Sequence, residues 1–579
     1  MRSRLPLLAV LLAALVLRLV GIGHGFPETE YVPDTHEVRA ALGMAKDKDP
    51  FPPVGRYSTY PNLLPYVLLP CYAGQYALGR VTGEWGGADE YGMRLKLEPA
   101  RAHRVARIVT ALFGAALAIV VWLVLRDSGA RDVAAIGAWL AATCLLDVHF
   151  SVQERPWAPL ATFGMLACWF GARHAVSGRR RDVVLCGLAC GAAAATHQAG
   201  IPMLGICGIA WAASTTPWRP FGERFVQGVL GVASFAAVAV VVGYNAYLVH
   251  GAPAASPDAT GDLAVGGQAI VFAVRWASVE HLVGAMLGYD PVICVLALVG
   301  LVAALRSRGA RVPTLFGLAW LAFFTTNQND HVRYVLPGVV LLIVPAAVGA
   351  RTLLARGAAG RAALGLLLLF PLVQSARLAL VLTREDTRAV ATRELLAHPP
   401  DGVVAVDRYG PELPPNLASL DRASSYRELY AREELEAEAI RAGVIEDGPV
   451  EWFRIGEVLA FDERHRGSQG APGRFAGAAS ADEVLDALGA DLVLLVDRDT
   501  SDDLPPLLVD PAPSLPFERG ARAGRPAPKL PPIALAGEPL LVVGEDRAEQ
   551  RLPTELDFAL TTIWRVRRPG PRLELWKRE

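Results

Sequence analysis

The sequence predicts a polytopic α-helical membrane protein of about eleven spans, followed by a water-soluble α/β domain. Three observations lead to this prediction. Hydrophobic residues make up 53% of the 579 residues and charged residues only 20%, which is more apolar than an ordinary soluble chain. Apolar segments of about 20 residues, the length that crosses a bilayer, recur up to residue 383. From residue 384 onward the chain becomes charged and contains many prolines.

The first apolar segment, LPLLAVLLAALVLRLVGIG, follows Arg2 and Arg4. It is longer than the apolar part of a signal peptide and no A-x-A cleavage site ends it, so we expect an uncleaved span. Ten further segments are candidate spans: 105–126, 131–149, 158–177, 183–197, 200–214, 224–248, 289–306, 312–327, 333–350 and 361–383. Residues 1–383 therefore form the predicted membrane domain.

The arginine distribution predicts how these spans are oriented. Lys and Arg are retained in the cytoplasmic connections of membrane proteins. Here every second connection is rich in arginine: those near 126–131, 179–181, 219–224, 306–311 and 351–361. We expect these connections and the N-terminus inside, and the connections at 150–157, 197–199, 249–288 and 328–333 outside. The predicted location is the inner (plasma) membrane, with multiple passes.

Residues 24–104 then form the first external loop. Within it, PNLLPYVLLPCYAGQYALG is apolar enough to span, but two prolines interrupt it and the topology leaves no room for a crossing. We expect a helix that lies along the outer interface. One group of residues opposes the positive-inside tendency and requires anionic partners or lipid phosphate: Arg94, Lys96, Arg101, Arg104 and Arg107.

Residues 384–579 read as a soluble domain, and the alternation of spans places it outside the cell membrane. DGVVAVD and ADLVLLVD have the composition of buried strands, and AREELEAEAIRAG and ADEVLDAL have that of helices. IWRVRRPGPRLELWKRE predicts a closing hairpin around its Pro-Gly-Pro turn. An α/β arrangement follows.

Charge and cysteine content narrow the class of function. A formal net charge of −1 with dispersed arginines gives no basic face, so we expect no nucleic-acid partner. The seven cysteines lie in or beside apolar stretches, and none has a metal-ligand spacing shared with His or Asp. We interpret them as small buried apolar residues and predict no metal site.

Polar residues gather in four connections that the topology places outside. They are Asp34, His36, Glu37, Arg56 and Tyr60; Asp147, His149, Glu154, Arg155 and Trp157; Thr196, His197 and Gln198; and Asn327, Asn329, Asp330, His331, Arg333 and Tyr334. Each group alone is compatible with an ordinary water interface. Together they predict one outward cavity, because polar groups at membrane depth are costly unless they are paired or used.

Such a cavity suits a particular chemistry. A carboxylate accepts the proton of an acceptor hydroxyl, while arginine stabilises an anionic phosphate that leaves. Phosphate at a lipid boundary indicates a lipid-phosphate donor.

The motifs support this interpretation by resemblance. YVPDTHEVRAALGMAKDKDPFPP followed by YSTYPNLLPYVLLPCYAGQYALG resembles the start of bacterial polyprenyl-phosphate-dependent glycosyltransferases of the GT-C fold. These include proteins similar to dolichyl-phosphate-mannose protein mannosyltransferases and lipid A aminoarabinose transferases. The similarity continues in LLDVHFSVQERPWAP, in AATHQAGIPML and in DHVRYVLPGVVLLIVPAA, and extends over most of residues 5–350.

The resemblance implies roles for individual residues. Asp34 takes the place of the family's catalytic carboxylate, with Glu37 as the displaced second acid. Arg333 and Tyr334 match an Arg-Tyr-x-x-Pro motif near the donor phosphate, and the guanidinium fork suits phosphate. Further phosphate-side candidates are His197, Arg107 and Arg155. The acceptor side of the cavity is assigned to His36, Tyr60 and Asp330.

Three positions depart from the family pattern. Thr35 stands where Glu usually follows the catalytic Asp, and Trp157 stands where the motif Arg-x-Asp has its acid. His197 replaces a lysine, so that a fixed cation becomes titratable. These departures imply an altered donor or acceptor, or a chain that has lost catalysis.

The functional hypothesis is an inverting glycosyltransferase that moves a sugar from a polyprenyl-phosphate-sugar lipid to an unidentified protein, lipid or glycan acceptor outside the membrane. We expect no cofactor and no metal; the alternative is a divalent ion held by Asp34 and Glu37. Two other classes stay open. One is a transporter or flippase of a lipid-linked solute, although no internal repeat is visible. The other is a catalytically silent membrane scaffold that binds a glycan.

Overall fold

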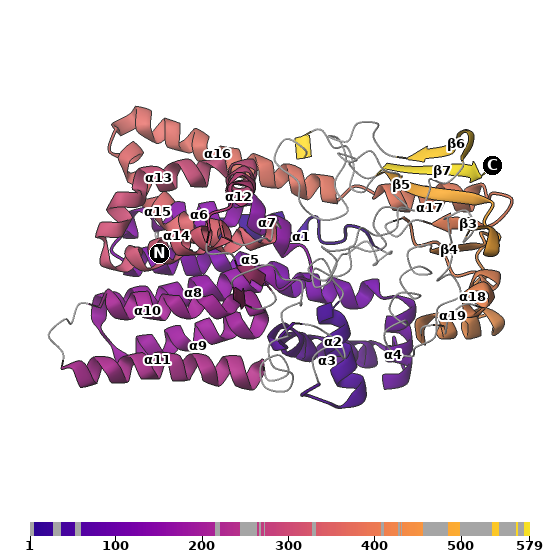
Figure 1. Ribbon diagram of the computed structural model, residues 1–579, viewed down its shortest axis with the longest axis horizontal. Coiled ribbons are helices and arrows are strands. Elements are labelled where there is room, and N and C mark those ends of the chain that lie inside the picture. The colour runs from indigo at the N-terminus through magenta and orange to yellow at the C-terminus, as the bar shows by residue number, and fades with distance from the viewer. Residues whose placement is uncertain are drawn as a thin grey trace.

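The computed structural model describes residues 5–26, 36–52, 60–214, 220–243, 263–265, 268–270, 273–326, 332–406, 410–425, 429, 431–454, 485–497, 535–543, 563–564 and 572–578. Helices make up most of the chain as far as residue 397, and a sheet with helices beside it lies at one end of the helical bundle (Figure 1).

The elements of the amino-terminal part, in chain order, are α1 (Leu5–Leu19), α2 (His36–Asp47), α3 (Leu63–Thr82), α4 (Ala88–Leu97), α5 (Ala100–Asp127), η2 (Arg131–Val133), α6 (Ala134–Thr143), α7 (Leu145–Ser151), α8 (Trp157–Ser177), α9 (Arg180–Thr196), η3 (Gln198–Met203), α10 (Leu204–Ala212), α11 (Phe221–Val242), β1 (Leu263–Val265), β2 (Gln268–Ile270), α12 (Trp276–Tyr289), α13 (Pro291–Arg306), α14 (Arg308–Phe324), η5 (Val332–Tyr334), α15 (Leu336–Leu354), α16 (Gly357–Leu382) and α17 (Thr387–Ala397). Every segment predicted as a span coincides with one or more of these helices.

The predicted number of spans is not reproduced by helix length alone. Among the described residues, four helices are long and apolar enough to cross a membrane: Ala100–Asp127, Phe221–Val242, Leu336–Leu354 and the run Gly357–Ala397. Six result if two bent pairs each form one span. The chain turns by 51° between η2/α6 and α7, and by 107° between α12 and α13. The count of eleven therefore stays a prediction, since several helices are shorter than a full crossing.

Small residues allow the bundle helices to pack closely. A Cβ on Gly300 of α13 would lie 2.0 Å from the Pro345 carbonyl oxygen of α15, and one on Gly349 would lie 2.1 Å from the Leu296 oxygen. Gly187 and Gly191 of α9 bring that helix equally close to α11. Close backbone contact at small residues is how helices associate within a lipid environment.

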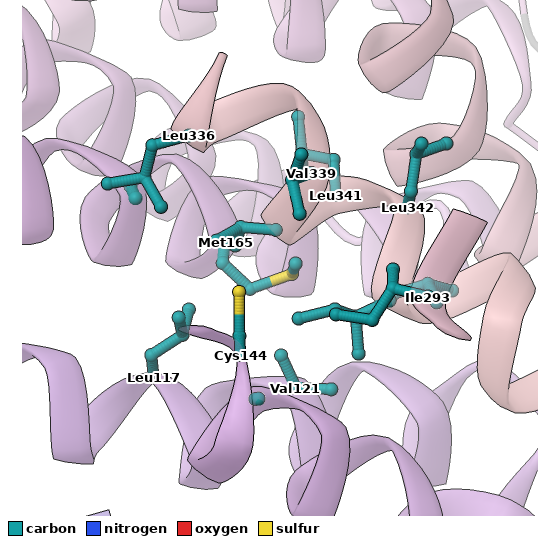
Figure 2. Packing of buried hydrophobic residues seen from close by; sticks show 14 of the residues in the cluster. Leu117, Val121, Cys144, Met165, Ile293, Leu336, Val339, Leu341 and Leu342 are labelled. Carbon is teal, nitrogen blue, oxygen red and sulfur yellow. The ribbon is translucent and has the colours of Figure 1, made fainter. Parts of the chain in front are cut away.

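The interior of the bundle is apolar and comes from helices far apart in the sequence. Figure 2 shows side chains from α5, α8, α13 and α15 meeting around Cys144, which lies between α6 and α7. The labelled residues are Leu117, Val121, Cys144, Met165, Ile293, Leu336, Val339, Leu341 and Leu342, and all nine are buried.

The arginine-rich connections are linked to one another. Arg351 pairs with Asp132 and the Ser307 hydroxyl donates to the Ser128 carbonyl at 3.2 Å. Trp169 of α8 donates to Asp127, and the same helix carries Arg173, which pairs with Asp182 at 3.1 Å. Arg180 pairs in turn with Glu223 at the start of α11. The connections predicted to be cytoplasmic therefore share one end of the bundle.

At the opposite end, three of the five basic residues that oppose the positive-inside tendency have acidic partners. The pairs are Arg94 with Glu90 and Glu98, Arg101 with Glu84 and Glu98, and Arg107 with Glu154. This pairing explains how arginines are tolerated on the side that the topology makes external. The described residues of the loop include the helices α2 to α4, and the predicted interfacial helix is α3, with Pro70 inside it. Its placement along the membrane surface stays a prediction.

The carboxyl-terminal part contains α18 (Leu417–Ser424), α19 (Ala431–Arg441) and a five-stranded sheet in the order β4-β3-β5-β7-β6. The strands are β3 (Val404–Val406), β4 (Trp452–Arg454), β5 (Leu492–Asp497), β6 (Leu535–Val543) and β7 (Arg572–Arg578). β3 runs parallel to β4 and β5, whereas β7 is antiparallel to β5 and β6.

The two predicted strands in this part are β3 and β5, and the predicted helix AREELEAEAIRAG is α19. Of the predicted closing hairpin, β7 is a strand, but its partners are β5 and β6. The first two residues of the other predicted arm, Ile563 and Trp564, are helical, and the rest of that arm lies outside the described residues. α19 packs against α4, so this sheet and the first loop lie at the same end of the molecule (Figure 1).

Candidate functional site

The structure describes part of the predicted site. Asp34, Thr35 and Asp330 lie outside the described residues, as does the side chain of His36, the first residue of α2. Glu37 follows in the first turn of α2 and is fully buried. The other predicted residues fall into two groups that meet at the connection between α7 and α8.

Four of the predicted phosphate-side and acceptor-side residues come together with one departure residue. We call this the aromatic cluster: Tyr60, Trp157, His197, Arg333 and Tyr334. The ring centroid of His197 lies 4.8 Å from that of Tyr60 and 4.5 Å from that of Trp157. Trp157 and Tyr334 are 4.8 Å apart and meet edge to face. The residues come from four separate segments, which the sequence alone does not join.

Local structure fixes each ring of the aromatic cluster. Trp157 begins α8 directly after Pro156, whose ring cannot donate a backbone hydrogen bond and suits this position. His197 lies between α9 and η3 in an extended conformation, and its Nδ1 accepts a hydrogen bond from the Ala199 amide at 2.9 Å. Because Nδ1 is an acceptor, the ring proton is on Nε2. Tyr334 ends η5, and Trp320 donates to its carbonyl at 2.8 Å.

The charge of His197 differs from what its place in the family motif implies. Burial and the nearby Arg333 guanidinium lower the pKa of His197 to about 3. The imidazole is therefore neutral at physiological pH, and the lysine-like cation that the motif would supply is missing from this position. Arg333 is the cation of the aromatic cluster.

Arg333 is held by rings and not by a carboxylate. Its guanidinium carbon lies 6.0 Å from the Trp157 ring centroid and 5.6 Å from that of Tyr334. Within the described part of the chain Arg333 forms no ion pair, and its side chain is only partly buried. Cation–π contacts orient a guanidinium and leave its N–H donors available.

The second group is a buried ionic cluster around Glu154, made with His103 and Arg107 of α5. Glu154 accepts from His103 at 2.7 Å and from Arg107 Nε at 2.9 Å. Arg107 Nη1 also donates to the carbonyls of Ile22 and His24, just after α1. Glu154 and Arg107 are fully buried. Burial raises the pKa of Glu154, but Arg107 and His103 outweigh it and hold the pKa at about 2.

Arg107 was a predicted phosphate ligand, and its geometry suits another task better. Two of its three nitrogens are committed to Glu154 and to the carbonyls of the first loop, and Phe26 covers the guanidinium at 4.2 Å. Nη2 has no hydrogen-bond partner among the described residues. Arg155, another candidate, is also buried, in the short connection that runs from Glu154 to Trp157. This connection joins the ionic cluster to the aromatic cluster.

Sequence reasoning missed a third set of partners. Arg18 of α1 and Asp147 of α7 form an ion pair in which both side chains are fully buried. Arg18 Nη1 also donates to the Ala142 carbonyl at 3.0 Å. The signal was present in the first apolar segment, because an arginine inside a span requires a partner. The sequence could not show that this partner lies 129 residues away.

A cavity of about 400 Å³ lies beside the ionic cluster. It is formed by the end of α1 and the junction of α16 with α17, and includes His24, Phe26, Arg384 and Asp386. The outward cavity predicted from the sequence would be lined by residues of the aromatic cluster and of the first loop. This 400 Å³ cavity is lined by other residues.

Comparison with known proteins supports the resemblance drawn from the motifs. Residues 97–244, about a quarter of the chain, match the family model described as dolichyl-phosphate-mannose-protein mannosyltransferase. This confirms the similarity to polyprenyl-phosphate-dependent glycosyltransferases. No curated protein matches the chain in a sequence comparison.

Several solved structures match this chain at low identity. ArnT from Cupriavidus metallidurans bound to undecaprenyl phosphate is 16% identical, with 68% of this chain and 72% of that chain covered and a TM-score of 0.41. The archaeal oligosaccharyltransferase AglB from Archaeoglobus fulgidus is 12% identical, with 85% and 69% covered and a TM-score of 0.44. Arabinofuranosyltransferase AftD from Mycobacteria is 17% identical, with 98% and 39% covered and a TM-score of 0.41.

Proposed function

We propose that this chain is an integral membrane glycosyltransferase that transfers a sugar from a polyprenyl-phosphate donor to an acceptor on the outer side of the membrane, with inversion at the sugar. Two lines support the proposal. The family match covers α5 to α11, which carry Trp157 and His197. The chain also assembles an aromatic cluster around a cation without a carboxylate partner in the described residues.

Arg333 is the observation that carries the proposal. An arginine oriented by two aromatic rings keeps its donors for an external anion, and a guanidinium binds two phosphate oxygens at once. His197 is neutral and donates through Nε2, so it offers a hydrogen bond to a phosphate or sugar oxygen without adding charge. The donor phosphate is therefore assigned to Arg333, with His197 and Tyr334 beside it.

In the reaction that we propose, the acceptor hydroxyl attacks the anomeric carbon and its proton passes to the carboxylate of Asp34. The bond from the anomeric carbon to the phosphate oxygen breaks, and the electron pair leaves with the polyprenyl phosphate. Arg333 stabilises the negative charge that develops on this leaving group. Glu37 and Arg155 stay candidates for positioning, as do His36, Tyr60 and Asp330 on the acceptor side.

Arg107 has a positioning role in this scheme. It fastens the carbonyls of Ile22 and His24, where the first loop begins, to Glu154. Glu154 thus belongs to the connection that ends in Trp157, and through Arg107 it also holds the start of the segment that leads to Asp34. Phosphate binding by Arg107 fits less well, because only one nitrogen is uncommitted among the described contacts.

The proposal is tested with the purified full-length chain and polyprenyl-phosphate donors that carry different radiolabelled sugars, in the presence of a membrane extract as the source of acceptor. We expect transfer with at least one donor and release of polyprenyl phosphate. Asp34→Asn should abolish transfer while donor binding persists. Asp47→Asn, an exposed carboxylate of the same loop, is the matched control and should retain transfer.

Three outcomes would contradict the proposal. Full transfer by Asp34→Asn would remove the assigned base. Donor binding without any transfer by the native chain would favour the silent glycan-binding scaffold, and movement of intact donor across vesicles without sugar release would favour the flippase.

A further inference from the structure

Three cysteines from two helices converge in the bundle, away from the candidate site. Cys186 and Cys190 belong to α9 and Cys207 belongs to α10, and their sulfur atoms all lie within 4.8 Å of one another. Cys207 Sγ is 3.3 Å from Cys186 Sγ and 3.8 Å from Cys190 Sγ. All three side chains are buried. In the sequence these thiols have no metal-ligand spacing with His or Asp, and they were predicted to be buried packing residues.

The local structure of α9 presents two of the thiols together. Cys186 and Cys190 are four residues apart, so they lie on the same face of the helix one turn from each other. The glycine after each of them, Gly187 and Gly191, faces α11 instead. This alternation points both sulfurs toward α10. There Cys207 meets them, and Cys190 also donates to the Met203 carbonyl at 3.1 Å.

The spacing of the sulfurs fits a metal ion. Three sulfurs about 2.3 Å from a central ion in one plane are about 4 Å apart, close to the two separations of 3.3 and 3.8 Å. Zinc normally takes four ligands, and within the described residues this group offers three sulfurs. Three soft donors without a fourth suit a soft monovalent ion. We propose that Cys186, Cys190 and Cys207 form a binding site for Cu(I).

Charge and access agree with this assignment. An apolar interior penalises net charge, and a monovalent ion needs only one thiol to lose its proton for a neutral site. Cys207 is 6% exposed, whereas Cys186 and Cys190 are wholly buried. Cys186 also lies within two turns of Arg180, at the arginine-rich end of the bundle. In the predicted topology this end faces the reducing cytoplasm, which keeps thiols and copper reduced.

The three cysteines share no residue with the aromatic cluster, yet they have a structural link to it. A bound ion would tie α9 to α10, and the connection between these helices holds His197. Binding of Cu(I) would therefore stabilise the helical hairpin that places His197 beside Trp157.

The test is an anaerobic titration of the purified full-length chain in detergent with Cu(I), in competition with a chromophoric Cu(I) chelator. We expect one ion per chain and an X-ray absorption spectrum with three sulfurs at about 2.3 Å. Binding should raise the melting temperature, because only the folded chain brings the thiols together. Cys186→Ser, Cys190→Ser and Cys207→Ser should each weaken Cu(I) binding by roughly 100-fold or more.

Cys294→Ala is the matched control, because Cys294 is a buried cysteine of α13 outside the group. It should bind Cu(I) like the native chain. The melting temperature of each variant without copper shows whether it is folded. Equal Cu(I) binding by the native chain and the folded serine variants would overturn the proposal. So would a disulfide between Cys186 and Cys207 in chain purified under reducing conditions, or a preference for Zn(II) over Cu(I).

Discussion

Two arginines at the end of the bundle that the topology predicts to be external, Arg107 and Arg333, have opposite surroundings. Arg107 is fully buried, paired with Glu154, and bonded to the carbonyls of Ile22 and His24. Arg333 is partly buried and lies against the rings of Trp157 and Tyr334, without an ion pair in the described part of the chain. A cation whose donors are already used holds the fold together, whereas a cation held by rings keeps its donors for a ligand. This difference predicts distinct consequences for substitutions in the two clusters.

The largest expected effect is on stability and belongs to the ionic cluster. Glu154→Ala leaves the Arg107 guanidinium buried without its counter-ion, so the free energy of unfolding should fall by about 3–5 kcal/mol. Thermal or denaturant unfolding in detergent measures this. The control is Glu98→Ala, which removes an exposed partner of Arg101 and should cost less than about 1 kcal/mol. Equal losses in both variants would contradict a structural role for the buried pair.

The next effect is on activity and belongs to the aromatic cluster. Arg333→Gln should lower kcat/KM for the polyprenyl-phosphate donor by roughly 100-fold, because the charge on the leaving phosphate loses its stabilising cation. Its melting temperature should stay close to that of the native chain, since no described ion pair is broken. Arg333→Lys should recover part of the rate, because lysine keeps the charge but not the fork. A large drop in the melting temperature of Arg333→Gln with unchanged kcat/KM would show that Arg333, like Arg107, stabilises the fold and does not bind the donor.

The contrast between the arginines also shows what the sequence could predict. The apolar segments gave the helices, and the alternation of arginine-rich connections agrees with the shared end that the structure gives them. The motifs selected Tyr60, His197, Arg333 and Tyr334, which the structure brings together from two segments before α10 and one after α14. Span count was harder. Cys144 divides the predicted span 131–149 into shorter helices, and α12, which forms a bent pair with α13, lies in a segment predicted as a connection.

Partners were the least predictable feature. Glu154, His103 and Arg107 are each visible in the sequence, yet whether an arginine meets a phosphate or a carboxylate depends on which helices cross beside it. The same holds for Cys207, which lies 17 residues beyond Cys190 and joins it only because η3 folds α10 back against α9. The departures Trp157 and His197 contact each other, so they form one altered surface and not two independent losses.

A smaller effect on activity should follow from the ring that both His197 and Arg333 approach. Trp157→Leu removes the aromatic face 6.0 Å from the Arg333 guanidinium, and a contact of this kind contributes about 1 kcal/mol. We expect the KM for the donor to rise about 5-fold with little change in kcat, because a misplaced guanidinium weakens binding in the ground state as well. Trp157→Phe keeps an aromatic face and should have a KM nearer to the native value. Identical KM values for Trp157→Leu and Trp157→Phe would show that the aromatic face does not contribute to donor binding.

The smallest effect is a pH dependence, and it distinguishes His197 from the lysine of the family motif. With a folded pKa of about 3 against 6.5 for free histidine, the unfolded chain binds the extra proton more readily between these values. The contribution of His197 to stability is therefore complete above pH 6.5 and declines as the pH falls toward 3. Between pH 7.5 and 5.5 the loss should be about 1 kcal/mol, and His197→Gln should lose that much less than the native chain.

Burial and Arg107 lower the pKa of His24 to about 3 as well. The contribution of His24 to the acid sensitivity should therefore persist in His197→Gln and disappear only when His24→Gln is added. Melting curves at the two pH values provide the comparison. An unchanged difference between pH 7.5 and 5.5 in His197→Gln would mean that the pKa of His197 is the same in the folded and the unfolded chain.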